Sequence, residues 1–171
     1  MAASLGRRLR RVWRHWCSTA AAGRRAFPPA TLKAVGAAIA AGERAHRGEL
    51  RLIVEAALPL HAAWAGLANR QRAIALFAEH GVWDTEDNCG VLIYVNLAAR
   101  KVDIVADRAI ARRIDAATWQ ALCTKLTEGY AQGNFHDSTL AAIAGVNELL
   151  RSHFPATGVR ANELPDQPLI L

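Results

Sequence analysis

The chain has 171 residues, which is enough for one domain with a hydrophobic core and short for two. Hydrophobic residues make up 52% and charged residues 21%, which excludes global disorder. Of the charged residues, seven arginines lie in residues 1–25, which contain no acid, whereas residues 26–171 carry 14 Lys and Arg against 15 Asp and Glu. This neutral body disfavours nucleic acid as a partner, because binding the phosphate backbone needs clustered basic side chains.

The three cysteines Cys17, Cys89 and Cys123 lie far apart and form no CxxC pattern. This spacing indicates neither a structural zinc site nor a disulfide framework. No stretch approaches the ~18 continuous apolar residues of a spanning helix, and no signal-peptide core is evident. We therefore expect a cytoplasmic protein, with peripheral contact at the inner membrane.

The first predicted helix covers residues 5–16 of a basic amphipathic segment that extends to residue 26. Arginines and His15 separate apolar residues that recur at helical spacing. These apolar residues are Leu5, Leu9, Val12, Trp13 and Trp16. Such a helix suits an anionic membrane surface, where each arginine gains ~1 kcal/mol, and it equally suits a membrane-protein partner. A solvated terminus and an organelle transit peptide are the alternatives.

The body of the chain, residues 27–155, alternates between helical and strand patterns. Helices are predicted after Pro29, over residues 62–80, and after the N-cap residues Asp115 and Asp137. Strands are predicted over residues 49–55, 91–95 and 101–106. Residues 156–171 show little periodicity and are predicted to form an irregular C-terminal tail.

This order of elements predicts an α/β fold, namely a three-layer α/β/α sandwich with a small mixed sheet. The first strand and the helix after it require a right-handed crossover to the strand at 91–95. The short connection between residues 95 and 101 predicts an antiparallel hairpin.

Residues 27–155 resemble the TPM domain, which occurs in a thylakoid-lumen acid phosphatase and in bacterial membrane-linked proteins. The resemblance rests on residues 43–49, on Asn88 to Val95, on Ile104 to Asp107 and on Gly133-Asn134-Phe135. Cys89 stands where the family pattern has asparagine, and Ala109 where it usually has glycine. The resemblance implies the sandwich fold and either an accessory role at a membrane or phosphatase activity.

The hairpin is expected to gather acidic residues at one edge of the sheet. Its first strand begins and its second strand ends at the same place, so the preceding loop meets Asp107. The residues expected there are Asp84, Glu86, Asp87, Asn88 and Asp107, with Cys89 exposed beside them. These oxygen ligands suit calcium or magnesium, and such a metal would orient a phosphate for attack by water. The alternative is a solvated loop in which the acids cap turns or pair with arginines.

Two functions follow from these patterns. The first is a TPM-like accessory domain on a membrane surface or membrane partner, with little or no catalysis and a divalent cation at the acidic edge. The second is a metal-dependent phosphatase acting on phosphomonoesters, with Asp87 and Asp107 as the catalytic residues. Whether the protein is an enzyme is left open by the sequence.

Overall fold

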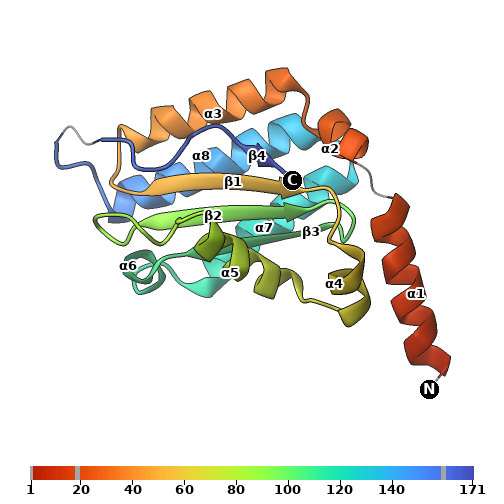
Figure 1. The fold of residues 1–171 in the computed structure, drawn as a ribbon. Coiled ribbons are helices and arrows are strands. Elements are labelled where there is room, and N and C mark those ends of the chain that lie inside the picture. Colours follow the sequence, from red (N-terminus) through yellow and green to blue (C-terminus); the bar gives the residue numbers. More distant parts are fainter. Residues whose placement is uncertain (1, 18–19, 159–160) are drawn as a thin grey trace.

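The computed structural model describes residues 2–17, 20–158 and 161–171. They form a mixed α/β domain with one helix extending from its end (Figure 1). The helices are α1 (Ala2–Cys17), α2 (Ala20–Ala26), α3 (Pro29–Glu43), α4 (Leu60–Ala65), α5 (Asn69–Glu79), α6 (Arg108–Ala111), α7 (Ala116–Ala131) and α8 (Phe135–His153). The strands are β1 (Glu49–Glu55), β2 (Gly90–Asn96), β3 (Lys101–Ala106) and β4 (Leu169–Ile170).

The strands form one mixed sheet in the order β3-β2-β1-β4. β1 and β2 are parallel, and β2 and β3 form the predicted antiparallel hairpin. β2 is buried along its whole length, as expected for a central strand with apolar residues on both faces.

Helices cover both faces of the sheet, which confirms the predicted three-layer α/β/α sandwich. On one face α3, α7 and α8 bury a core that includes Leu52, Val54 and Ile93. On the other face Ile53 and Leu92 pack against α5 (Figure 1). The two sets alternate along each strand because successive side chains point to opposite faces of a sheet.

The helix predicted over residues 62–80 is wrong as a single element, because the structure has two helices there. α4 ends at Gly66, which adopts φ 79° and donates its N–H to the carbonyl oxygen of Ala62. This left-handed conformation is accessible to glycine without strain and turns the chain away before α5. Similarly, α8 begins after Asn134, so Asp137 lies in its first turn instead of capping it.

The C-terminal residues are more ordered than the predicted irregular tail. β4 pairs with β1 in parallel, and Leu164 is buried in the core on the α5 face. The guanidinium of Arg51 donates to the carbonyl oxygens of Pro165 and Gln167 and fixes the approach to β4. In the described part of the chain, no helix combines the length and hydropathy needed to cross a bilayer.

Candidate functional site

The sheet brings the predicted site residues to one edge. β1 and β2 begin there, with Glu49 paired to Gly90, and β3 ends there. The N–H of Asp107 donates to the carbonyl oxygen of Gly90 at 2.9 Å. We call residues 84–88 together with Glu49 and Asp107 the acidic rim.

The loop of residues 84–88 is shaped by its backbone and by a buried threonine. The N–H of Asn88 donates to the carbonyl oxygen of Thr85 at 3.0 Å, and Asn88 adopts φ 54°, which asparagine tolerates. The hydroxyl of Thr85 accepts the N–H of Cys89 at 2.9 Å. The expectation of an exposed Cys89 is therefore wrong, because this bond and the start of β2 carry its side chain into the core.

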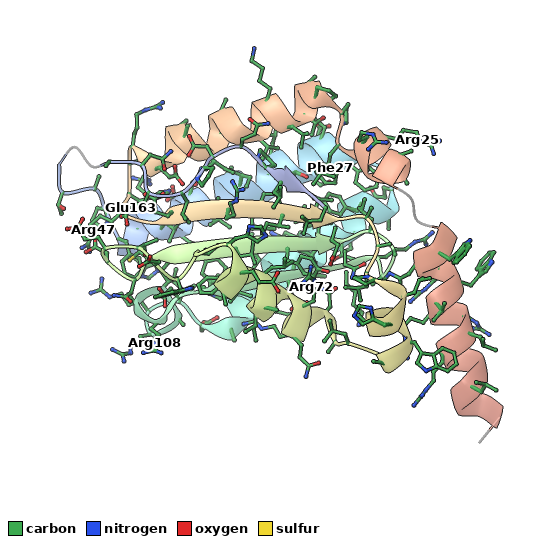
Figure 2. The ribbon with its side chains drawn as sticks, in the orientation of Figure 1. Arg25, Phe27, Arg47, Arg72, Arg108 and Glu163 are labelled. Carbon is green, nitrogen blue, oxygen red and sulfur yellow. The ribbon has the colours of Figure 1, made fainter. Side chains whose placement is uncertain are left out.

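The carboxylates of the acidic rim have different surroundings. Asp87 Oδ2 lies 3.3 Å from Nη1 of Arg47, which Figure 2 labels at this end of the sheet. Asp84 and Glu86 are exposed, and the N–H of Glu86 donates to the carboxylate of Glu163. Within residues 2–17, 20–158 and 161–171, no three His, Cys, Asp or Glu side chains converge as ligands of one metal ion.

Asp107 is the acidic-rim residue with an unmet hydrogen-bonding requirement. It caps α6, because Oδ1 accepts the N–H of Arg108 at 2.6 Å. The residue is only 7% exposed, and Oδ2 is buried without a hydrogen-bond partner among the described residues. A buried carboxylate oxygen in this state is unfavourable unless a donor or a cation reaches it. Asp107 is thus the predicted ligand whose own surroundings fit a cation.

A cavity of about 410 Å³ lies beside the acidic rim and contains Glu49 of the rim together with two carboxyl groups that were not among the predicted site residues. Glu43, Glu49 and Asp166 line it. Burial, reinforced by Glu49 and Asp166, raises the pKa of Glu43 to about 9, although the N–H of Leu50 donates to its carboxyl at 2.9 Å. Burial also raises the pKa of Glu49. This cavity holds Glu43 in its protonated form at neutral pH.

The three carboxyl residues of this cavity differ in how clearly the sequence points to them. Glu43 and Glu49 flank the entry to β1 and belong to one of the segments that carry the family resemblance. Asp166 lies in the segment predicted to be irregular, and its position depends on the pairing of β4 with β1. No local pattern specifies such a pairing between two distant segments.

At the other end of the sheet, α1 docks on the body through its polar face. Nδ1 of His15 accepts the N–H of Leu58 at 3.0 Å, and His15 is 3% exposed. The guanidinium of Arg8 lies over the ring of Trp64 in α4, 5.9 Å from its centroid. Residues 8, 11 and 15 share one side of a helix, and Arg11 approaches Gly66 on that side. The body therefore contacts the basic side of α1.

The apolar side of α1 faces outward as a result. Leu5, Leu9, Trp13 and Trp16 are 50%, 54%, 66% and 69% exposed. We call these four residues the outward stripe. An amphipathic helix at a protein surface ordinarily buries its apolar side against the core, so the arrangement here is the reverse of the usual one.

A buried polar network stabilises the same end of the sheet. The hydroxyl of Tyr94 donates to Glu55 at 2.5 Å, and Arg72 forms an ion pair with Glu55 at 3.0 Å. Nδ2 of Asn96 donates to the hydroxyl of Tyr94 at 3.2 Å. Burial and the neighbouring Glu55 raise the pKa of Tyr94, so it stays a donor at physiological pH. The network joins α5 to β1 and β2 and is structural in character.

The molecule is thus a small α/β/α domain with carboxylates at one end of its sheet and a basic helix docked at the other. The chain belongs to the TPM domain family, whose pattern matches residues 23–149. This match confirms the resemblance inferred from the sequence.

Among solved structures, the chain is similar to the BA42 protein of the psychrophilic bacterium Bizionia argentinensis, determined by NMR. The two share 24% sequence identity, and the TM-score is 0.71 over 82% of this chain and 92% of that chain. At this identity the likeness concerns the fold. No curated protein sequence matches the chain.

Proposed function

We propose that the chain is a TPM accessory domain that attaches to an anionic membrane surface through α1 and has little or no catalytic activity of its own. The observation that carries the proposal is the orientation of α1. Its polar side is held by His15 and Arg8, which leaves the outward stripe available for contact with something other than the body.

The composition of α1 favours a lipid surface as that contact. Trp13 and Trp16 are both exposed, and indole rings favour the headgroup level of a bilayer. Arg10 and Arg14 are exposed beside the stripe, where they can reach anionic headgroups. The absence of any acid from residues 1–25 removes the like-charge repulsion that would oppose such contact.

Vesicle co-sedimentation tests this attachment. The full chain is expected to sediment with phosphatidylcholine vesicles that contain phosphatidylglycerol, and less with phosphatidylcholine alone. The double variant Trp13→Glu, Trp16→Glu should stay in the supernatant, because it places charge on the side of α1 that would enter the bilayer. The matched control Ile74→Glu, Trp83→Glu changes two other exposed apolar residues and should bind as the unmodified chain does.

Equal sedimentation of the two double variants would overturn the proposal. So would failure of the unmodified chain to sediment with anionic vesicles. In that case a membrane-protein partner on the outward stripe becomes the better explanation, because a protein groove can accept the same apolar side.

A second candidate function is a metal-dependent phosphatase at the acidic rim, and one observation favours it. The buried Oδ2 of Asp107, which has no hydrogen-bond partner in the described part of the chain, is suited to a calcium or magnesium ion, which would supply charge neutralisation for a bound phosphate. Asp87 lies at the same edge, paired with Arg47. An arginine there is also able to contact a phosphate group.

Calcium and magnesium titrations followed by NMR, combined with hydrolysis of p-nitrophenyl phosphate, separate the two functions. Cation binding without turnover supports the accessory domain. Turnover that is lost in Asp107→Asn and Asp87→Ala, but retained in the exposed control Asp137→Asn, establishes the phosphatase. Melting temperatures of all variants show whether a loss reflects chemistry or unfolding.

A further inference from the structure

A second cavity, of about 830 Å³, lies at the end of the sheet opposite the acidic rim. It is bordered by α2, by the turn between β2 and β3, and by the segment where α7 ends and α8 begins. We call it the α2–α7 cavity. Its volume is within the range of about 300–1,000 Å³ that is typical of small-molecule sites.

The walls of the α2–α7 cavity are apolar and firmly packed. Val102, Tyr130 and Phe135 line it, and the rings of Tyr130 and Phe135 stack with centroids 4.9 Å apart. Phe27, labelled in Figure 2, meets both rings edge-on at 5.9 and 5.8 Å. These aromatic contacts hold the wall in place without any ligand.

The uncharged polar side chains of the cavity are already satisfied within the protein. Nδ2 of Asn96 donates to the hydroxyl of Tyr94, and its Oδ1 accepts the N–H of Ala99. The hydroxyl of Thr127 donates to a carbonyl oxygen of its own helix, and that of Tyr130 is bonded to Thr139. The interior therefore offers a ligand apolar surface and few free hydrogen-bonding groups, which suits a hydrocarbon body.

Three cations line the same cavity, and no acid lines it. They are Arg25 of α2, Arg100 of the β2–β3 turn and Lys101 at the start of β3. All three are exposed, and none forms an ion pair within the described part of the chain. Arg25 donates Nε to the carbonyl oxygen of Ala21 at 3.4 Å, which leaves its terminal nitrogens available. Positive charge beside an apolar chamber is complementary to an anionic group on an apolar chain.

We propose that the α2–α7 cavity binds one single-chain anionic amphiphile, with the acyl chain in the apolar chamber and the carboxylate or phosphate headgroup on Arg25, Arg100 and Lys101. A polar metabolite would leave its own polar atoms unpaired against these walls. An uncharged lipid would gain no electrostatic attraction from the three cations. The proposal does not depend on attachment of α1 to a membrane, because the cavity is formed by other elements.

Calorimetric titration of the full chain tests the site with three twelve-carbon probes, the anionic ones below their critical micelle concentrations and the alcohol below its solubility limit. Dodecanoate and dodecyl phosphate carry the two anionic headgroups, and dodecanol carries neither. At least one anionic probe is expected to bind with a stoichiometry of one, and at least tenfold more tightly than dodecanol. The anionic probe that binds more tightly identifies the headgroup that the site prefers.

Two variants, each with a matched control, show where the probe binds. The triple variant Arg25→Gln, Arg100→Gln, Lys101→Gln should bind the anionic probe at least tenfold more weakly. Its control, Arg108→Gln, Arg112→Gln, Lys125→Gln, removes three exposed cations outside the cavity and should bind normally. Ala131→Trp places a ring at the cavity and should block the chain, whereas Ala121→Trp, exposed on the same helix, should not.

Binding of dodecanol as tightly as the anions would overturn the proposal, as would the absence of saturable binding by either anion. Equal affinities of the triple variant and its control would also overturn it. The cavity variants are expected to retain vesicle binding, and the α1 variant Trp13→Glu, Trp16→Glu to retain probe binding. A failure of one proposal is thereby distinguishable from a failure of the other.

Discussion

The neutral imidazole of His15 connects α1 to the body through a hydrogen bond with Leu58. Burial, followed by the neighbouring Arg14 and Arg11, lowers the pKa of His15 below 6.5, and Glu55 opposes this change. In undocked α1 the imidazole keeps a pKa near its usual value of about 6.5 and takes up a proton first as the pH falls. Its Nδ1 accepts the N–H of Leu58 only when it is unprotonated. The docking of α1 on the body should therefore be complete above the usual pKa of histidine, about 6.5, and should weaken at lower pH.

We predict that the amide signal of Leu58 moves as the pH is lowered from about 7.5 to about 5, the range in which histidine titrates. An NMR titration measures this movement. The change should disappear in His15→Gln and persist in His61→Gln, which alters an exposed histidine on α4. A signal that titrates equally in both variants would show that His15 does not control the docking.

Glu43 should make the folded state less stable as the pH rises. Its pKa is about 9 when folded and about 4.5 when unfolded, so between these values the folded chain holds a proton that the unfolded chain has released. Glu43→Gln keeps an acceptor for the N–H of Leu50 and removes this proton. We predict that its melting temperature falls less than that of the unmodified chain between about pH 6 and about pH 9.

Melting curves with a chelator present measure this difference without interference from divalent cations. The exposed control Glu128→Gln should retain the full pH dependence. Part of the dependence should survive in Glu43→Gln, because burial raises the pKa of Glu49 in the same direction. Identical curves for Glu43→Gln and the unmodified chain would contradict the assignment.

At the level of single elements, β1, β2 and β3 were predictable, whereas β4, the break at Gly66 and the start of α8 were not. Leu50, Leu52 and Val54 alternate with residues of the opposite face, so periodicity alone located β1. Asp115 was correctly predicted as an N-cap, since its Oδ1 accepts the N–H of Thr118 at 2.7 Å. Gly66 was missed because the alanine-rich sequence around it has high helix propensity, and its left-handed conformation is visible only in the structure.

We predict that Gly66→Ala destabilises the domain mainly through backbone strain. The left-handed conformation costs about 1–2 kcal/mol for a residue with a side chain. The new methyl carbon would also lie 2.9 Å from Nη1 of Arg11, but this atom ends a flexible side chain that can move aside. Urea unfolding measures the loss. Gly81→Ala is the matched control, because Gly81 has φ 64° but open space around it, and it should show the strain alone.

For the whole molecule, the acidic rim was predictable from topology and the 410 Å³ cavity was not. An antiparallel hairpin necessarily places the start of β2 beside the end of β3, which brings residues 84–88 near Asp107. The cavity instead requires the C-terminal segment to return along β1, and this return is set by tertiary pairing. The orientation of α1 was equally hidden, because an amphipathic pattern does not specify which side the body will hold.

We predict that ending the chain at residue 158 lowers the melting temperature. Removal of an irregular tail would leave the melting temperature unchanged. The truncation removes β4 and the bonds of Leu171 with Val54 and Ala56, and it exposes the core around Leu164. Leu164→Ala in the full chain isolates the burial component and should cost about 2–4 kcal/mol in a denaturant titration. Unchanged stability in both variants would show that the segment is loosely held.

The outward stripe also gives the protein a built-in optical reporter. Of the five tryptophans, Trp13, Trp16, Trp64 and Trp83 are exposed, and Trp119 is buried in the core. The fluorescence of the free chain is therefore dominated by indoles in contact with water. Entry of Trp13 and Trp16 into any apolar phase would shift the emission to shorter wavelength and shield it from aqueous quenchers, so the state of α1 is readable without a label.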